Sequence, residues 1–286
     1  MSAPAMAPER RAGAADLEAR ESALYRALAE RPSLIVAYSG GVDSAYLAFA
    51  ATRVLGSRAL CVTADSPSYP ERHRQMALRL ATEFGFRHEF IRTDEMARPE
   101  YRANAGDRCY HCKHELYTHL TAIARDRGVA AVADGSNADD RGDYRPGRRA
   151  AREFGVLSPL DAADLTKSDI RELSHRAGLP TWDEPASACL SSRIPYFSEV
   201  TSEKLRTIEH AESVLRELGF RICRVRHHDT IARLELGRDE IARALEPGMA
   251  EAIDRELRAL GYQHVTVDLR GYRLGSLNEA LRLRPV

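Results

Sequence analysis

The chain has 286 residues, 44% of them hydrophobic and 29% charged, a composition typical of a globular protein with one large or two smaller domains. Its 42 basic residues equal its 42 acidic residues, so no overall field favours nucleic acid or a membrane surface. No apolar run approaches the roughly 20 residues of a membrane helix, and the N-terminus lacks a signal-peptide pattern. Five unevenly spaced cysteines argue against a disulfide framework, so we expect a cytoplasmic protein.

The first two elements are an expected disordered leader over residues 1–14 and a helix over 15–30. The leader is rich in Ala and Pro. Leu17 and Leu28 lie on the apolar stripe of the helix, together with Leu24 and Tyr25. Pro32 ends the helix.

A glycine-rich turn follows a predicted buried strand over Leu34–Ala37 and precedes a predicted helix beginning near Ala45. Asp43 and Ser44 are predicted N-caps of that helix. Free backbone N–H groups and the positive helix end face one anionic group in such a turn. Neither the Walker pattern nor the dinucleotide pattern is present, and the alternative is an ordinary strand–helix turn. The residues predicted to bind phosphate are Ser39, Gly40, Gly41, Asp43 and Ser44.

Strands and helices alternate further along the chain, which predicts an α/β fold with a doubly wound parallel sheet. Ligands of such sheets bind beyond the carboxyl ends of the strands, where Asp134–Asn137 is expected. The predicted strands cover residues 58–65, 88–92 and 129–133, and the predicted helices cover 71–84, 111–127 and 166–178.

The polar segment 134–152 is rich in Arg and Asp. One interpretation is a solvated loop. The other is an active-site lid whose charges meet phosphate, Mg²⁺ or an acidic substrate. A second loop is predicted over 182–197.

A second domain is predicted to begin at residue 198, so that 15–197 form the nucleotide domain and 198–286 a smaller α+β domain. Thr201 begins a helix, and the order of elements after it is α-β-β-α-β. The predicted strands are 221–226, 231–236 and 264–269, and the helical segments between the last two are 238–245 and 249–260.

Three of the cysteines are candidate redox, metal-binding or nucleophilic residues. Cys109 and Cys112 form a CxxC motif at a predicted helix start, a spacing that suits a redox pair or a metal centre, including a zinc site with His111 or His114. Cys189 lies in a loop beside Arg193, whose guanidinium group would favour a thiolate. Cys61 and Cys223 lie in strands and are interpreted as small buried hydrophobes.

These motifs together resemble the LarE family, within the PP-loop ATP pyrophosphatase superfamily. The family comprises ATP-dependent sulfur transferases of nickel-pincer nucleotide cofactor biosynthesis, needed for lactate racemase maturation. The SGGVDS loop by itself resembles only the superfamily. The segments that carry the family resemblance are 39–44, 107–113, 134–140, 143–147, 188–195, 224–226, 232–235 and 268–278.

The resemblance implies that ATP adenylates a carboxylate of pyridinium-3,5-biscarboxylic acid mononucleotide with release of pyrophosphate. Sulfur then displaces AMP and leaves a thiocarboxylate. Some family members donate the sulfur of a single cysteine, which becomes dehydroalanine. Others hold a [4Fe-4S] cluster on three cysteines, and its open iron carries a sulfide. Cys109, Cys112 and Cys189 resemble the cluster type, and sacrifice of Cys189 is the alternative.

The resemblance also implies roles for further residues, a sulfide source as partner, ATP and Mg²⁺ as cofactors, and a trimeric or hexameric homo-oligomer. Gly135 is expected near the nucleotide, and Arg193 beside Cys189. Other PP-loop enzymes remain rivals, namely a tRNA thiolase or an amidating synthetase, as does a non-catalytic metal or nucleotide sensor. The zero net charge disfavours a nucleic-acid substrate. The residues expected to bind the mononucleotide are Ser192, Glu212, Arg224 and Arg226.

Overall fold

The computed structural model describes residues 14–142, 146–185, 188–273 and 275–278. Within these ranges no helix is both long and apolar enough to cross a membrane. The chain forms two compact units. The first unit comprises the chain up to Ala64 together with 72–92 and 116–184, and the second comprises 65–71, 93–115 and the chain from Pro185. Two early segments thus join the C-terminal part, and the domain boundary at residue 198 stays a prediction.

A parallel sheet forms the centre of the first unit, and its strands are β1 (Leu34–Ala37), β2 (Ala59–Asp65), β3 (His88–Arg92) and β4 (Ala131–Ala133). Their order in the sheet is β3-β2-β1-β4. β1 is parallel to both neighbours, with Leu34 opposite Ala59 on one side and Ala131 on the other. Every residue of β1 is buried, as expected for a strand covered on both faces.

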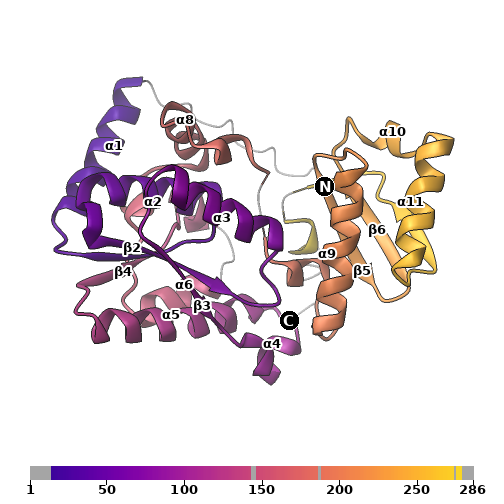
Figure 1. Cartoon of the computed structure of the whole chain (residues 1–286), viewed down its shortest axis with the longest axis horizontal. Coiled ribbons are helices and arrows are strands. Elements are labelled where there is room, and N and C mark those ends of the chain that lie inside the picture. The colour runs from indigo at the N-terminus through magenta and orange to yellow at the C-terminus, as the bar shows by residue number, and fades with distance from the viewer. Residues whose placement is uncertain (1–13, 143–145, 186–187, 274, 279–286) are drawn as a thin grey trace, which may run out of the picture. The chain divides into compact units, whose positions relative to one another are not determined.

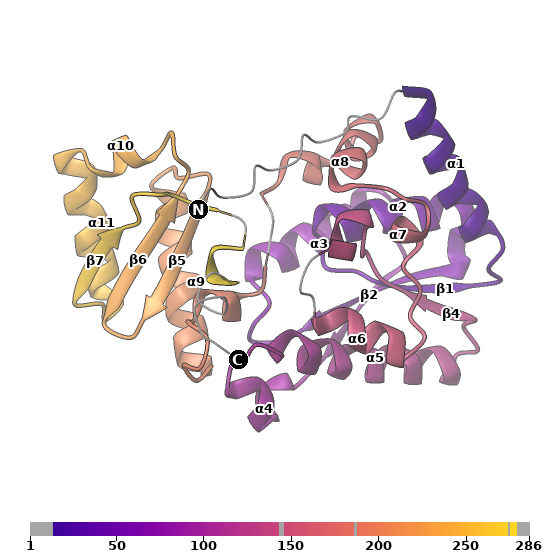
Figure 2. The same ribbon diagram turned by 180° about the vertical axis from the view of Figure 1, so that it is seen from behind.

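Helices cover both faces of this sheet (Figures 1 and 2). α2 (Val42–Leu55) and α3 (Glu71–Glu83) lie on one face, and α5 (Arg108–Asp126) and α6 (Pro146–Glu153) on the other. α1 (Ala14–Ala29) and α8 (Lys167–Arg176) pack against α2, and α7 (Pro159–Ala162) packs against α1. The predicted doubly wound α/β fold is confirmed.

The first helix is held by a partly buried polar cluster as well as by its leucines. Leu24 and Leu28 are buried in the core. The Glu21 carboxylate accepts hydrogen bonds from the Tyr25 hydroxyl (2.9 Å) and the Tyr46 hydroxyl (2.7 Å). The predicted helix over 15–30 is therefore confirmed. The predicted leader, apart from Ala14, lies outside the described residues.

The polar segment 134–152 contains more regular structure than the predicted loop. A 3₁₀ helix covers Ala138–Gly142, and α6 begins at Pro146. Ala150 and Ala151 are buried, so α6 has an apolar side of small residues under its arginines. Asp143 and Arg145, which the prediction included, lie outside the described residues.

The second unit contains a mixed sheet of β5 (Cys223–His228), β6 (Ile231–Leu236) and β7 (His264–Val267), in this order. β5 is antiparallel to β6, and β6 is parallel to β7. α9 (Ser202–Glu217) packs on β5, and α11 (Pro247–Ala259) packs on α9 and β7. The remaining helices of this unit include α4 (Pro99–Arg102), α10 (Ile241–Ala244) and a 3₁₀ turn at Leu190–Arg193.

Alternation along β5 separates a core face from a polar face. Cys223 and Val225 are buried against Ala211 and Leu215 of α9. Arg224 and Arg226 alternate with these two core residues along the strand, so their side chains point to the opposite face. This alternation sets up the arginine-rich site described below.

Candidate active site

The predicted phosphate loop follows β1, as expected. α2 begins at Val42 with Gly41 as its N-cap, so the prediction that Asp43 and Ser44 cap the helix was wrong. Gly41 has extended dihedral angles, φ −80° and ψ 162°, which suit a cap. Asp43 and Ser44 instead lie in the first helical turn, where backbone N–H groups lack intrahelical partners. These groups are the donors available to a phosphate oxygen.

Hydrogen bonds within the loop hold its two serines together. The Ser44 hydroxyl donates to the Gly41 carbonyl (3.1 Å) and accepts from the Ser39 backbone N–H (3.1 Å). The hydroxyls of Ser39 and Ser44 are 3.0 Å apart. Gly40 has φ +68°, a conformation that an L residue rarely adopts, and an added Cβ would lie 3.2 Å from the Ala77 Cβ. These hydrogen bonds and the conformation of Gly40 fix the shape of the loop.

Gly135 lies where the end of β4 approaches the start of α2. A Cβ at this position would come within 3.0 Å of the Ser44 backbone nitrogen and 3.2 Å of its Cα. Backbone atoms cannot give way as a flexible side chain can. Gly135 thus lies against the nucleotide loop, and its position near the nucleotide stays a prediction.

We expect Gly135→Ala to displace the first turn of α2 and to raise the KM for ATP by about tenfold, with a loss of about 1–3 kcal/mol of stability from overpacking. Pyrophosphate release at varied ATP concentrations measures the effect. Gly248→Ala is the matched control, because no atom lies within 4 Å of a Cβ there. An unchanged KM in Gly135→Ala would contradict the assignment.

Two partners of Asp43 escaped the sequence analysis. The Lys167 ammonium lies 2.5 Å from one Asp43 oxygen, and the Asn137 amide donates to the other at 3.3 Å. Lys167 is the first residue of α8 and lies 124 residues from Asp43 in the sequence. No local pattern distinguishes this lysine from a solvated one. Asn137 carried a weak signal, because it follows β4 at the ligand-binding edge of the sheet.

Charged residues of the segment 134–152 are paired within the first unit. The Arg148 guanidinium lies 2.6 Å from Asp161, and Arg141 lies 2.6 Å from Asp164 and also contacts Asp161. These pairs tie the segment to α7. The structure therefore shows that Arg141 and Arg148 attach the segment to the chain around α7.

All three predicted ligand cysteines lie in the second unit. Cys109 and Cys112 are near the start of α5, and Cys189 is the N-cap of the 3₁₀ turn Leu190–Arg193. Cys109 is exposed, whereas Cys112 and Cys189 are partly buried. The predicted helix start at the CxxC motif is confirmed. Cys61 and Cys223 are buried in strands, as expected, and burial raises the pKa of Cys61 to about 12 and that of Cys223 to about 11.

A buried cation adjoins the cysteines. Arg108 is 3% exposed and donates to the Asn104 side chain and to the Ser191 carbonyl (2.9 Å). Burial alone would lower the pKa of Arg108, but the nearby Cys189 and Cys109 groups raise it. Conversely, burial raises the pKa of Cys112, and Glu95 and then Cys189 raise it further. Cys112 also packs against the hydrophobic cluster that contains Leu190, the residue after Cys189.

The donor chemistry of these cysteines fits an iron–sulfur cluster, because three thiolates leave one iron of a [4Fe-4S] cluster open. Their present positions do not form a ready ligand set. In the described part of the chain, no three His, Cys, Asp or Glu side chains are gathered closely enough to hold a metal ion. A cluster on these cysteines would require local movement of their side chains.

Arg193 supports the Cys189 loop and is almost completely buried. Its guanidinium group donates to the carbonyls of Ala188 (2.7 Å) and Cys189 (3.0 Å). It also pairs with Glu212 at 2.7 Å. Burial would raise the pKa of Glu212, but Arg193 overcomes this effect and lowers it to about 2. Glu212, which the resemblance assigned to substrate binding, is thus the counterion of a residue that holds the Cys189 backbone.

Ser192 and Arg226 connect this loop to the mixed sheet. The Ser192 hydroxyl donates to the Cys189 carbonyl (2.8 Å), and its own carbonyl accepts from Arg226 (2.7 Å). Arg224 is buried on the same face of β5, with its guanidinium carbon 5.1 Å from the centre of the Tyr272 ring. Burial, and next Arg193, lower the pKa of Arg224.

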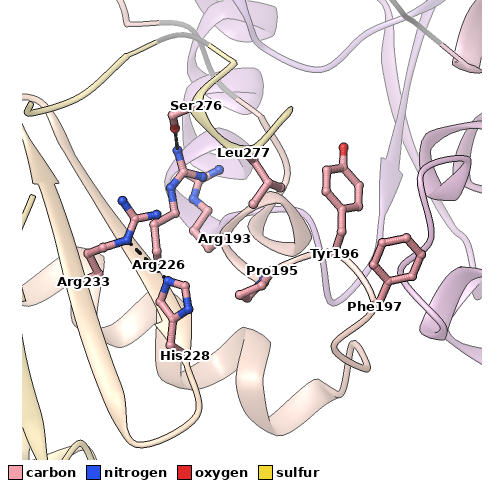
Figure 3. Close-up of a pocket in the computed structure, with 9 residues that line it drawn as sticks. All are labelled: Arg193, Pro195, Tyr196, Phe197, Arg226, His228, Arg233, Ser276 and Leu277. Carbon is pink, nitrogen blue, oxygen red and sulfur yellow. Dashed lines mark hydrogen bonds between the residues drawn. The ribbon is translucent and has the colours of Figure 1, made fainter. Parts of the chain in front are cut away.

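A pocket of about 160 Å³ lies beside these residues (Figure 3). Arginines and a serine gather at one end, and the aromatic rings of Tyr196 and Phe197 lie at the other. None of the described lining residues is acidic. Arg224 does not line the pocket. The lining residues are Arg193, Pro195, Tyr196, Phe197, Arg226, His228, Arg233, Ser276 and Leu277.

The pocket has the features of an anion site. Arg226 is 6% exposed, and its Nε has no hydrogen-bond partner among the described residues. A buried donor without a partner favours an incoming acceptor. No local pattern marks Arg233, Glu235 or Ser276 as site residues, because only the pairing of β5 with β6 and the return of the chain after β7 bring them to Arg226. Glu235 pairs with Arg226 at 2.6 Å.

Comparisons with known proteins find a family match over the part of the chain that contains the nucleotide loop. The sequence profile of the asparagine synthase family matches residues 19–139, which include the loop. An uncharacterized protein of Synechocystis sp. is 42% identical over 93% of this chain and 99% of its own length. A glutamine-hydrolysing GMP synthase of Aeropyrum pernix is 26% identical over 64% of this chain and 39% of its own length.

A further relative identifies the family. The pyridinium-3,5-bisthiocarboxylic acid mononucleotide synthase of Lactiplantibacillus plantarum is 37% identical over 93% of this chain and 96% of its own length. The aligned region therefore includes the nucleotide loop, the three cysteines and the β5 arginines. The chain belongs to the LarE family of ATP-using sulfur transferases.

Proposed function

We propose that the protein inserts sulfur into pyridinium-3,5-biscarboxylic acid mononucleotide, using ATP to activate a carboxylate. The name of the L. plantarum relative supports this substrate, because it describes a synthase of the corresponding bisthiocarboxylic acid mononucleotide. The observation that carries the proposal is that Cys109, Cys112, Cys189 and an arginine-rich pocket belong to one unit, in which Cys112 packs against the cluster that contains Leu190.

In the first stage, a substrate carboxylate oxygen attacks the α-phosphorus of ATP. The bond from that phosphorus to the bridging oxygen breaks, and pyrophosphate leaves. The first-turn N–H groups of α2 and the Ser39 and Ser44 hydroxyls are placed to bind phosphate oxygens. Asp43 supplies a carboxylate for Mg²⁺, and Lys167 supplies a cation once nucleotide separates the pair.

The pocket suits the phosphate end of the mononucleotide. Its volume of about 160 Å³ is smaller than the ~300–1,000 Å³ of sites that enclose whole small molecules, so it holds part of the substrate. Arg226 and Arg233 present guanidinium groups, which bind phosphate through two donors at a time. The rings of Tyr196 and Phe197 offer faces for a cationic pyridinium ring.

In the second stage, a sulfur nucleophile attacks the acyl carbon and AMP leaves with the electrons of the acyl–oxygen bond. Cys109, Cys112 and Cys189 would hold a [4Fe-4S] cluster. When bound, it would supply an iron free to carry a sulfide. The buried Arg108 guanidinium holds the Ser191 carbonyl of this loop, and Arg193 holds the backbone of Cys189 in place.

Sacrifice of Cys189 is the alternative. Here the Cys189 sulfur itself attacks the acyl carbon and AMP leaves. Loss of the Cys189 α-proton then breaks the Cβ–S bond. The products are a thiocarboxylate and dehydroalanine, with no net oxidation or reduction.

Iron and acid-labile sulfide measured on anaerobically purified and reconstituted protein separate the two sulfur sources. About four irons per chain, lost in Cys109→Ala, Cys112→Ala and Cys189→Ala, are expected for the cluster. Cys61→Ala is the matched control and should keep its iron, because Cys61 is buried in β2. Absence of iron would refute the cluster, and a residue 189 lighter by one H₂S after turnover would establish sacrifice.

A further inference from the structure

The chain after β7 returns along the mixed sheet and is bonded to β6 by its backbone. The Asp268 N–H donates to the Leu234 carbonyl (2.9 Å), and the Tyr272 N–H donates to the Leu236 carbonyl (2.7 Å). Gly271 between them has φ +64°, and an added Cβ would lie 2.8 Å from the Leu236 oxygen. Only glycine permits this close approach. We call residues 268–273 and 275–278 the C-terminal segment.

Side chains attach the C-terminal segment to the arginines of the polar face. Asp268 pairs with Arg233 and lies 3.7 Å from Arg273. The Tyr272 ring packs against the Arg224 guanidinium. These contacts use one arginine that lines the pocket, Arg233, and one beside it on the polar face, Arg224, so the segment is an integral part of this face.

Ser276 is the polar residue by which this segment reaches the pocket. Its hydroxyl accepts a hydrogen bond from the Arg226 Nη2 (2.9 Å) and lies 3.1 Å from both oxygens of Glu235, to which it donates (Figure 3). Glu235 is completely buried and pairs with Arg226 and with Arg233. Ser276 and Leu277 also line the pocket.

We propose that Ser276 is a positioning residue for the anion pocket, and that the ligand it serves is a phosphate monoester. Without the Ser276 hydroxyl, Glu235 and Arg226 would each lose a hydrogen-bond partner. The Arg226 guanidinium could then turn fully toward the Glu235 carboxylate. With the hydroxyl, Arg226 is held at Nη1 by Ser192 and at Nη2 by Glu235 and Ser276. Two of its five N–H groups, that of Nε and the second one of Nη1, make none of these bonds and are then left for a ligand oxygen.

The C-terminal segment thus forms one wall of the substrate site. The identity of the phosphate monoester as the pyridinium mononucleotide rests on the proposed function, whereas the positioning role of Ser276 does not. An experiment can therefore refute the identity of the ligand without refuting the positioning role of Ser276, and the reverse.

Two measurements test the proposal with three variants. Isothermal titration with inorganic phosphate is performed with α,β-methylene-ATP occupying the nucleotide loop, so that only the pocket responds. Ser276→Ala should bind phosphate about tenfold more weakly, since a hydrogen bond to a charged group is lost. Ser276→Thr keeps the hydroxyl and should bind within about twofold of the unchanged protein. Ser213→Ala in α9 removes a hydroxyl outside the pocket and is the matched control.

Steady-state kinetics provide the second measurement. Ser276→Ala should raise the KM for the mononucleotide about tenfold, with little change in kcat or in the KM for ATP, as expected when uniform binding is removed. Equal phosphate affinity in Ser276→Ala and the unchanged protein would overturn the proposal, as would no phosphate binding at all. Phosphate binding that depends on Ser276, in a protein that releases no pyrophosphate with the mononucleotide, would refute only the proposed function.

Discussion

Cys189→Ala is expected to abolish sulfur insertion, by roughly 10³-fold or more, because both proposed sulfur sources depend on this thiol. Adenylation needs only ATP and the substrate carboxylate. The exchange of labelled pyrophosphate into ATP in the presence of the mononucleotide should therefore continue. The thiocarboxylate product, measured by mass spectrometry, should be absent.

Cys223→Ala is the matched control for this prediction. Cys223 is buried in β5 behind the polar face, and its thiol contacts the Glu212 backbone carbonyl at 3.8 Å. Its removal leaves a small cavity and should lower stability by about 1 kcal/mol without stopping sulfur insertion. If Cys189→Ala still formed thiocarboxylate, or if it lost pyrophosphate exchange as well, the separation of the two stages would be wrong.

Glu212→Gln is expected to destabilise the second unit by about 3–5 kcal/mol, because it leaves the guanidinium of Arg193 buried without its counterion. Arg193 and Glu212 are 2% and 1% exposed. The same change should lower sulfur insertion, since Arg193 also holds the carbonyls of Ala188 and Cys189. Denaturant unfolding and product formation measure the two effects. Glu217→Gln, further along α9 and exposed, is the control.

The same ion pair predicts a dependence of stability on pH. The pKa of Glu212 is lowered from an ordinary 4.5 to about 2 in the folded protein. The carboxylate therefore contributes stability that is fully present above pH about 4.5 and is lost as the pH falls toward 2, in total about 3 kcal/mol. Glu212→Gln should lack this component of the acid-induced loss. Parallel loss of stability in both proteins between about pH 5 and 2 would show that the pair contributes nothing.

Local patterns in the sequence were sufficient for the architecture and for the local geometry of the phosphate loop, of β5 and of the CxxC motif. An apolar run, two glycines and an amphipathic helix determine the phosphate loop, because each acts through neighbours in the chain. Alternation along β5 placed Arg224 and Arg226 on one face, since successive side chains of a strand point to opposite sides. The CxxC motif at the start of α5 was predicted for the same kind of reason.

Only the tertiary structure decided which charges meet. Lys167 contacts Asp43 although the two are 124 residues apart in the sequence, and Ser276 contacts Arg226 at a separation of 50 residues. An arginine or glutamate in an isolated segment is expected to be solvated, so neither the burial of Arg193 with Glu212 nor that of Glu235 could be predicted. Burial of a charge requires a partner brought by a distant segment. The chemistry-bearing residue types are local properties of this sequence, whereas their partners are properties of the fold.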